Sequence, residues 1–182
     1  MSQASSPALR LTILEHVLQS PQSLNRSPGS VARGEVHWDW CLEMPDEVVT
    51  LSAEHRLWTW ASDPVSELPS IQRETTPDPI PCCRLPDHRT RYLDYEGEIS
   101  GQRGQVRALA RQRFKIVESV GLESSEVEPT RFMLRVALIN ESADRSTHSI
   151  LTGFTELIVR DATLSGITHE NDLNKFWEIL LR

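Results

Sequence analysis

The sequence lacks the features that mark several common classes of protein. It has three cysteines, Cys41, Cys82 and Cys83, and this odd number with an adjacent pair does not fit a disulfide framework. No CxxC spacing indicates structural zinc, and the GxGxxG, Walker-A and GxSxG motifs are absent. No apolar run approaches the roughly 18 residues of a membrane span, and MSQASSPALR lacks the pattern of a signal peptide. We therefore expect a cytoplasmic protein that does not contact membranes.

Lysine is also scarce, because Lys115 and Lys175 are the only two in 182 residues and arginine supplies the remaining positive charge. The net charge of −7 argues against a protein that coats nucleic acid indiscriminately. However, the segment from Arg84 to Lys115 holds eight basic and four acidic residues, a local charge of +4. This segment could recognise phosphate, or it could form a solvated strand face.

The length predicts one domain, residues 10–182, after a disordered tail at 1–9, with a loop insertion at 18–34 and a proline-rich loop at 62–81. Apolar and β-branched residues predict strands at 10–15, 35–43, 56–61, 105–110, 113–119, 131–140, 149–160 and the C-terminal KFWEILLR. We expect 105–110 and 113–119 to pair with each other. Strand follows strand with few helical periods, which indicates a mainly β protein: a compact antiparallel β-barrel or sandwich with little helix.

The segment 35–43 alternates most clearly. Val36, Trp38, Trp40 and Leu42 share one face, and Glu35, His37, Asp39, Cys41 and Glu43 share the other. Since the apolar face belongs to the core, we expect His37 and Asp39 to face solvent or a cavity.

Side chains at i and i+2 of a strand point to the same side, so His37 and Asp39 could converge on one ion. A mixed nitrogen and oxygen pair suits manganese, zinc or non-haem iron and needs a third donor, for which His16 is the natural candidate. The alternative is a simple hydrogen bond on an exposed face. Cys41 could also reach a metal and favour zinc, although a role as a small filler fits it better.

A second group, within residues 84–92, combines a histidine, a phenol and three arginines. His88 and Tyr92 could donate a proton and a hydrogen bond to a phosphate oxygen, with Arg84, Arg89 or Arg91 supplying positive charge. The alternative is an ordinary packing role for His88 and Tyr92 at a strand boundary.

These two segments resemble a known family. HWDWCLEM resembles the His-aromatic-Asp-x-x-Leu-Glu signature of the 3′-phosphoesterase module of bacterial ligase D, a multifunctional end-joining DNA ligase. RLPDHRTRYLDYEGEISG resembles that module's second signature, in which Asp-His-x-x-x-Tyr precedes an acidic-aromatic-Glu-Gly turn. The order agrees, as does a preceding strand that ends in histidine, ILEH. The resemblance covers roughly residues 11–119 and is closest to short, stand-alone relatives that lack polymerase and ligase domains.

The resemblance implies a compact β-barrel enzyme that uses manganese to remove a 3′-phosphate or a 3′-ribonucleoside from DNA or RNA–DNA ends during DNA repair. It implies His16, His37 and Asp39 as metal ligands. It places His88 and Tyr92 against the scissile phosphate, with Arg84 assisting. A separate ligase or polymerase would then use the 3′-hydroxyl.

The sequence departs from the family at three points. Cys41 stands where the family has an arginine, no lysine follows Trp60-Ala61, and the 21 residues from His16 to His37 exceed the usual gap. A long surface loop can absorb this insertion at little cost. The missing cations leave open a catalytically impaired module that binds nucleic-acid ends. The thiol of Cys41 beside His37 and Asp39 leaves open a zinc-dependent hydrolase of small phosphoesters.

Overall fold

The computed structural model describes residues 7–19, 36–48, 53–65, 78–121, 132–139, 150–161 and 177–182. These residues form nine strands and one short 3-10 helix: β1 (Leu9–Val17), β2 (Val36–Glu43), β3 (Leu57–Ser62), β4 (Ile80–His88), η2 (Thr90–Leu93), β5 (Gly97–Ile99), β6 (Gly104–Val120), β7 (Met133–Ile139), β8 (Glu156–Asp161) and β9 (Trp177–Leu181). None of the helical structure among them is long and apolar enough to cross a membrane.

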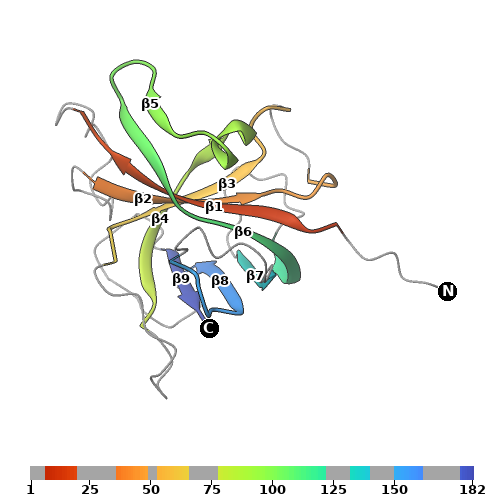
Figure 1. Cartoon of the computed structure of the whole chain (residues 1–182). Coiled ribbons are helices and arrows are strands. Elements are labelled where there is room, and N and C mark those ends of the chain that lie inside the picture. Colours follow the sequence, from red (N-terminus) through yellow and green to blue (C-terminus); the bar gives the residue numbers. More distant parts are fainter. Residues whose placement is uncertain are drawn as a thin grey trace.

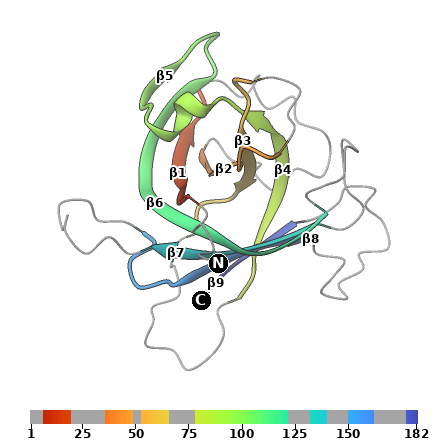
Figure 2. The ribbon, with the colours of Figure 1, turned by 90° about the vertical axis from the view of Figure 1, so that its right-hand side faces the viewer.

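All neighbouring strands pair antiparallel, in the order β1-β2-β3-β4-β9-β8-β7-β6-β5. A further pairing of β1 with β6 closes eight of the strands into a barrel, and β5 adds to one end of β6. Figure 1 shows β1, β2 and β3 crossing the middle of the molecule, with the β5–β6 hairpin projecting above them. Figure 2 shows β7, β8 and β9 forming the opposite wall. The structure therefore confirms the predicted fold class in its antiparallel β-barrel form.

Several predicted strands are confirmed within one or two residues at each end. They are 10–15 (β1), 35–43 (β2), 56–61 (β3) and 131–140 (β7), and the expected C-terminal strand is β9. The predicted tail at 1–9 and the loops at 18–34 and 62–81 fall largely outside the described residues. At their edges, Leu9 already belongs to β1, Ser62 to β3 and Ile80 to β4.

Two predictions about the later strands are wrong. The segments 105–110 and 113–119 do not pair with each other, because both belong to the single strand β6. Its first half pairs with β1 and its second half with β7, and register shifts near Ala108 and Ile116 accompany the change of partner. The predicted strand at 149–160 begins only at Glu156, since Ile150–Gly153 forms a turn.

Both faces of β2 are buried, whereas the alternation in the sequence indicated one face in the core. Trp38, Trp40 and Leu42 join the main core of the barrel, as predicted. Cys41, on the opposite face, joins a second cluster of buried residues: Leu14, Leu57, Tyr92, Leu93, Ile99 and Val106. The helix η2 covers this face, where Thr12 Oγ1 of β1 donates a hydrogen bond of 3.0 Å to the Leu93 carbonyl. His37 and Asp39 are buried, so this face is not open to solvent, which was one of the two surroundings expected for it.

Two buried tryptophans in the main core provide a test of how this core is held together. Trp40 Nε1 donates a 3.0 Å hydrogen bond to Ser62 Oγ, whereas Trp60 Nε1 has no hydrogen-bond partner among the described residues. Trp40→Phe should therefore lower the free energy of unfolding by about 1–2 kcal/mol more than Trp60→Phe, because it leaves the buried Ser62 hydroxyl unsatisfied. Urea denaturation of both variants measures the difference. Equal losses would contradict the assignment.

Candidate metal centre

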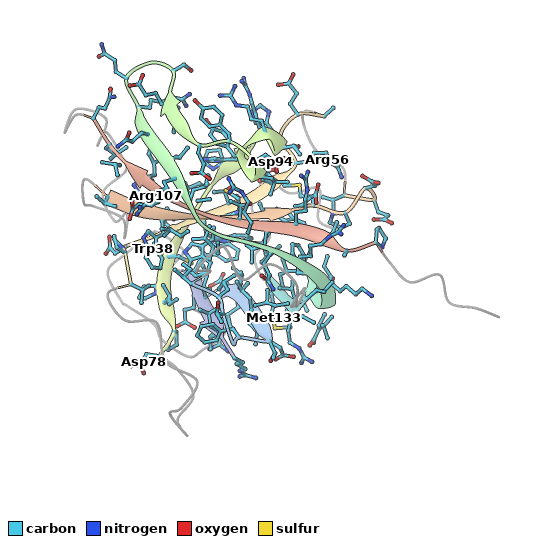
Figure 3. All side chains as sticks on the ribbon, viewed as in Figure 1. Trp38, Arg56, Asp78, Asp94, Arg107 and Met133 are labelled. Carbon is cyan, nitrogen blue, oxygen red and sulfur yellow. The ribbon has the colours of Figure 1, made fainter. Side chains whose placement is uncertain are left out.

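Three potential metal ligands meet where β1 and β2 pair. His16 lies directly opposite His37 in the antiparallel register, and Asp39 follows His37 by two residues on the same face. One ligand atom from each lies within 4.8 Å of the others. No second group of this kind occurs in the described segments. In Figure 3, the labelled Trp38, which separates His37 from Asp39, marks the place of this cluster along β2.

The carboxylate of Asp39 lies between the two imidazoles. Asp39 Oδ2 is 3.3 Å from His16 Nδ1, and Asp39 Oδ1 is 3.3 Å from His37 Nε2. The two rings are tilted, with centroids 4.5 Å apart. His37 and Asp39 are buried, with exposed fractions of 0% and 3%, so the cluster is shielded from bulk solvent. The arrangement presents two nitrogens and a carboxylate to one small region.

The hydrogen bond at the far side of His16 determines which nitrogen faces the cluster. His16 Nε2 is 2.9 Å from the Arg103 carbonyl, which can only accept, so Nε2 carries a proton. In the neutral ring, Nδ1 then directs a lone pair at the Asp39 carboxylate. Such a contact is favourable only with a proton or a cation between the two atoms. Metal-binding histidines commonly donate their second N–H to a carbonyl in this way, so the donor set fits a divalent ion.

Gly104 permits the close approach that supplies this carbonyl. Its φ is +105°, and a Cβ at this position would lie 1.9 Å from the Val17 carbonyl oxygen. Any larger residue would push β6 away from the end of β1. The glycine-rich turn is visible in the sequence as a turn signal, but no sequence pattern indicates that its Arg103 carbonyl contacts His16.

The environment of Asp39 favours its ionised form. Burial alone would raise the pKa of this carboxyl, but a proton on His16 Nδ1 or His37 Nε2, each 3.3 Å from a carboxylate oxygen, and the positive charge of His37 and His88 lower the pKa well below its usual range. Asp39 is therefore a carboxylate at neutral pH, as metal binding requires.

His88 and Tyr92 lie beside each other at the end of β4 and in η2. Their ring centroids are 5.6 Å apart. His88 Nδ1 donates a 2.8 Å hydrogen bond to the Pro86 carbonyl, which leaves Nε2 as the nitrogen for other partners. Tyr92 is buried in the second cluster together with Leu14 and Cys41. The structure thus brings both predicted residues to the face that carries the metal ligands.

Arg84 does not join this group. It pairs with Trp60 across β3 and β4, and its guanidinium lies 5.0 Å from the centroid of that ring. It donates to the Thr59 carbonyl at 3.0 Å, to the Leu85 carbonyl and to the Asp87 carboxylate. Because Trp60 belongs to the main core, Arg84 starts from the opposite face of the sheet to the metal ligands. The hydrogen bonds of the Arg84 guanidinium are therefore made to groups of the protein itself.

Cys41 is a core residue and does not belong to the ligand group. It is fully buried, and Thr59 Oγ1 lies 3.9 Å from its sulfur as a donor. Burial, reinforced by the charge of Asp39, raises the pKa of the thiol well above its usual value. Since metals bind the thiolate, a neutral thiol favours the role of small filler.

No protein-family model matches this chain, and no curated protein matches it. The class that the fold and the cluster define is thus a closed antiparallel β-barrel with a candidate His-His-Asp metal centre.

Metal binding can be tested with one ligand variant and one matched core variant. Asp39→Asn should weaken Mn²⁺ binding by more than about 100-fold, since changes outside the ligand shell alone cost 10–100-fold. Cys41→Ala, two residues along the same strand, should keep the affinity of the parent. Isothermal titration calorimetry on metal-stripped protein measures both. Equal affinity of Asp39→Asn and the parent would exclude Asp39 as a ligand.

The lowered pKa of Asp39 also predicts a dependence of stability on pH in the metal-stripped protein. Because the pKa is lower in the folded than in the unfolded chain, the carboxylate adds stability above the unfolded pKa and loses it as the pH falls toward the folded value. Between about pH 5 and pH 2, the parent should lose unfolding free energy more steeply than Asp39→Asn. Denaturant titrations across this range test the difference, and parallel pH profiles would contradict it.

Proposed function

We propose that this chain is a metal-dependent phosphoesterase that removes a 3′-phosphate or a 3′-terminal ribonucleoside from DNA or RNA–DNA ends. The observation that carries the proposal is the convergence of one ligand atom each from His16, His37 and Asp39 on one small region. The two segments that resemble the ligase D module are far apart in the sequence. They supply side chains to the same buried face, which supports a common site.

The residues divide into two roles. His16, His37 and Asp39 would hold the ion, for which manganese is the proposed choice. When bound, such an ion supplies a Lewis acid for a phosphoryl oxygen and lowers the pKa of a bound water. His88 Nε2 is the atom that would exchange a proton with the leaving oxygen, because Nδ1 is held by the Pro86 carbonyl. The hydroxyl of Tyr92 would donate to a phosphate oxygen.

The distribution of charge favours an anionic substrate. The positive segment from Arg84 to Lys115 includes η2 and the turn that contacts His16, although the whole chain carries a charge of −7. A local positive region on an acidic protein fits recognition of one end better than coating of a duplex. A separate ligase or polymerase would use the 3′-hydroxyl that the reaction leaves.

The second candidate is an end-binding module of the same fold with impaired catalysis. The neutral thiol of Cys41 favours it, because no cation stands where the family has an arginine. The zinc-dependent hydrolase of small phosphoesters is less favoured, since that alternative needs Cys41 as a ligand and Cys41 lies outside the group of converging ligand atoms.

A trimming assay distinguishes these candidates. A labelled primer with a 3′-phosphate or one 3′-ribonucleotide should be shortened to the 3′-hydroxyl form with manganese and not with EDTA. His88→Ala should lower kcat by about 10²–10⁴-fold, the range of general acid–base catalysis, while the Mn²⁺ affinity is retained. His55→Ala, a histidine outside the cluster, is the matched control.

Folded, manganese-loaded protein that binds the primer without shortening it would support the end-binding module instead. Protein that neither binds nor trims either primer would rule out both.

A further inference from the structure

The sequence leaves open which of three arginines beside His88 supplies positive charge to a phosphate. Arg84 is held by Asp87, two backbone carbonyls and the Trp60 ring. Arg89 Nε lies 3.6 Å from a Glu54 carboxylate oxygen, and the Glu54 carbonyl accepts a 3.0 Å hydrogen bond from the Thr90 N–H. The donors of Arg84 are thus used within the protein, and Arg89 has a carboxylate partner beside it.

Arg91 differs from both of them. It is exposed, and its guanidinium lies 5.3 Å from the centroid of Tyr92 and 5.4 Å from that of Tyr95. No carboxylate of the described residues forms an ion pair with it. Other arginines that pack around η2 are neutralised: Arg10 by Glu43 and Asp94, and Arg111 by Glu96. Among the described residues, Arg91 is therefore a cation without a counter-ion, and it lies beside Tyr92 of the proposed catalytic pair.

We infer that Arg91 is the substrate-binding cation of this site, contacting the 3′-terminal phosphate whose ester bond His88 and Tyr92 would act on. The inference rests on the proposed function and names the residue that fixes the phosphate. Arg91 would thus supply, from another position in the chain, the positive charge that the family has where this chain has Cys41.

The contacts of Arg91 suit this role. Its two aromatic neighbours meet edge to face, with centroids 6.1 Å apart, and together they support the guanidinium from one side. A guanidinium positioned in advance loses less freedom on binding, and its planar donors match two phosphate oxygens. Tyr92 in turn lies beside His88, with 5.6 Å between the ring centroids, so Arg91 is next to both residues of the proposed catalytic pair in the sequence of contacts.

Arg103 is a further exposed arginine near the cluster, and its Nε already has a partner within the protein. Its Nε donates a 2.9 Å hydrogen bond to the Ser100 carbonyl, within the turn whose backbone holds His16. The side chain of Arg103 therefore closes the β5–β6 turn, and the contribution of this residue to the site comes from its carbonyl.

Binding of short single-stranded oligonucleotides tests the inference independently of turnover. The parent protein should bind a 3′-phosphorylated oligonucleotide more tightly than the same oligonucleotide with a 3′-hydroxyl, by fluorescence anisotropy in manganese buffer. Arg91→Gln should weaken binding of the phosphorylated form about tenfold or more and remove most of this preference. It should also reduce the slope of log Kd against log salt concentration by roughly one.

Two further variants make the result specific to Arg91. Arg89→Gln removes the same charge two residues away and should keep both the preference and the salt slope. Arg91→Lys keeps the charge without the planar fork and should recover part of the affinity. The inference is overturned if Arg91→Gln keeps the preference of the parent, or if Arg89→Gln or Arg84→Gln loses it equally.

The outcome also separates this inference from the proposed function. Loss of the 3′-phosphate preference in Arg91→Gln, with no trimming by the parent, would support the phosphate contact and reject the esterase. Trimming by the parent, with an unchanged KM in Arg91→Gln, would support the esterase and reject the role of Arg91.

Discussion

The pairing of β1 with β2 is the constraint on which the site and the barrel both depend. It sets His16 opposite His37, and the same strand β1 closes the barrel through β6. A shift of one residue in the register of β1 would turn His16 to the other face of the sheet and separate it from His37 and Asp39. The register is secured from the opposite face, where Trp38 and Trp40 are buried in the main core. The packing of these tryptophans on one face of the sheet therefore determines the positions of His37 and Asp39 on the other face.

Burial gives the cluster its chemical character. A carboxylate taken out of water is costly unless its partners replace the lost hydration. For Asp39 the two imidazoles do so, and the balance leaves the pKa of the carboxyl low despite complete burial. Such a site holds concentrated negative charge that a cation satisfies better than a proton shared between His16 and Asp39. Because η2 covers the second face of β2, His37 and Asp39 do not form a simple hydrogen bond on an exposed strand face. Their burial is thus what favours metal binding.

The sequence predicted the features that follow from local periodicity. It did not predict the features that depend on contacts between distant elements. The alternation in 35–43 predicted β2, the inward tryptophans and the shared face of His37 and Asp39, since these follow from the two-residue repeat of a strand. The same pattern could not show that η2 covers the second face. It also could not show that 105–119 belongs to one strand, because this depends on β6 pairing with β1 along one part of its length and with β7 along the next. The contact of the Arg103 carbonyl with His16 is likewise invisible, since a backbone atom carries no sequence signature.

The same distinction bears on the proposed phosphate site, where position 41 is a cysteine and the proposed cation is Arg91. Position 41 is fully buried between Leu14, Leu57 and the Thr59 hydroxyl, where an arginine would need both space and a counter-charge. A neutral thiol there lets η2 pack tightly on the sheet. Arg91, at the exposed side of η2, bears no such desolvation cost and rests on two aromatic rings. A bound phosphate needs a positive charge close to it, whichever residue supplies that charge. The packing of η2 can bring Arg91 to such a place although position 41 holds a cysteine.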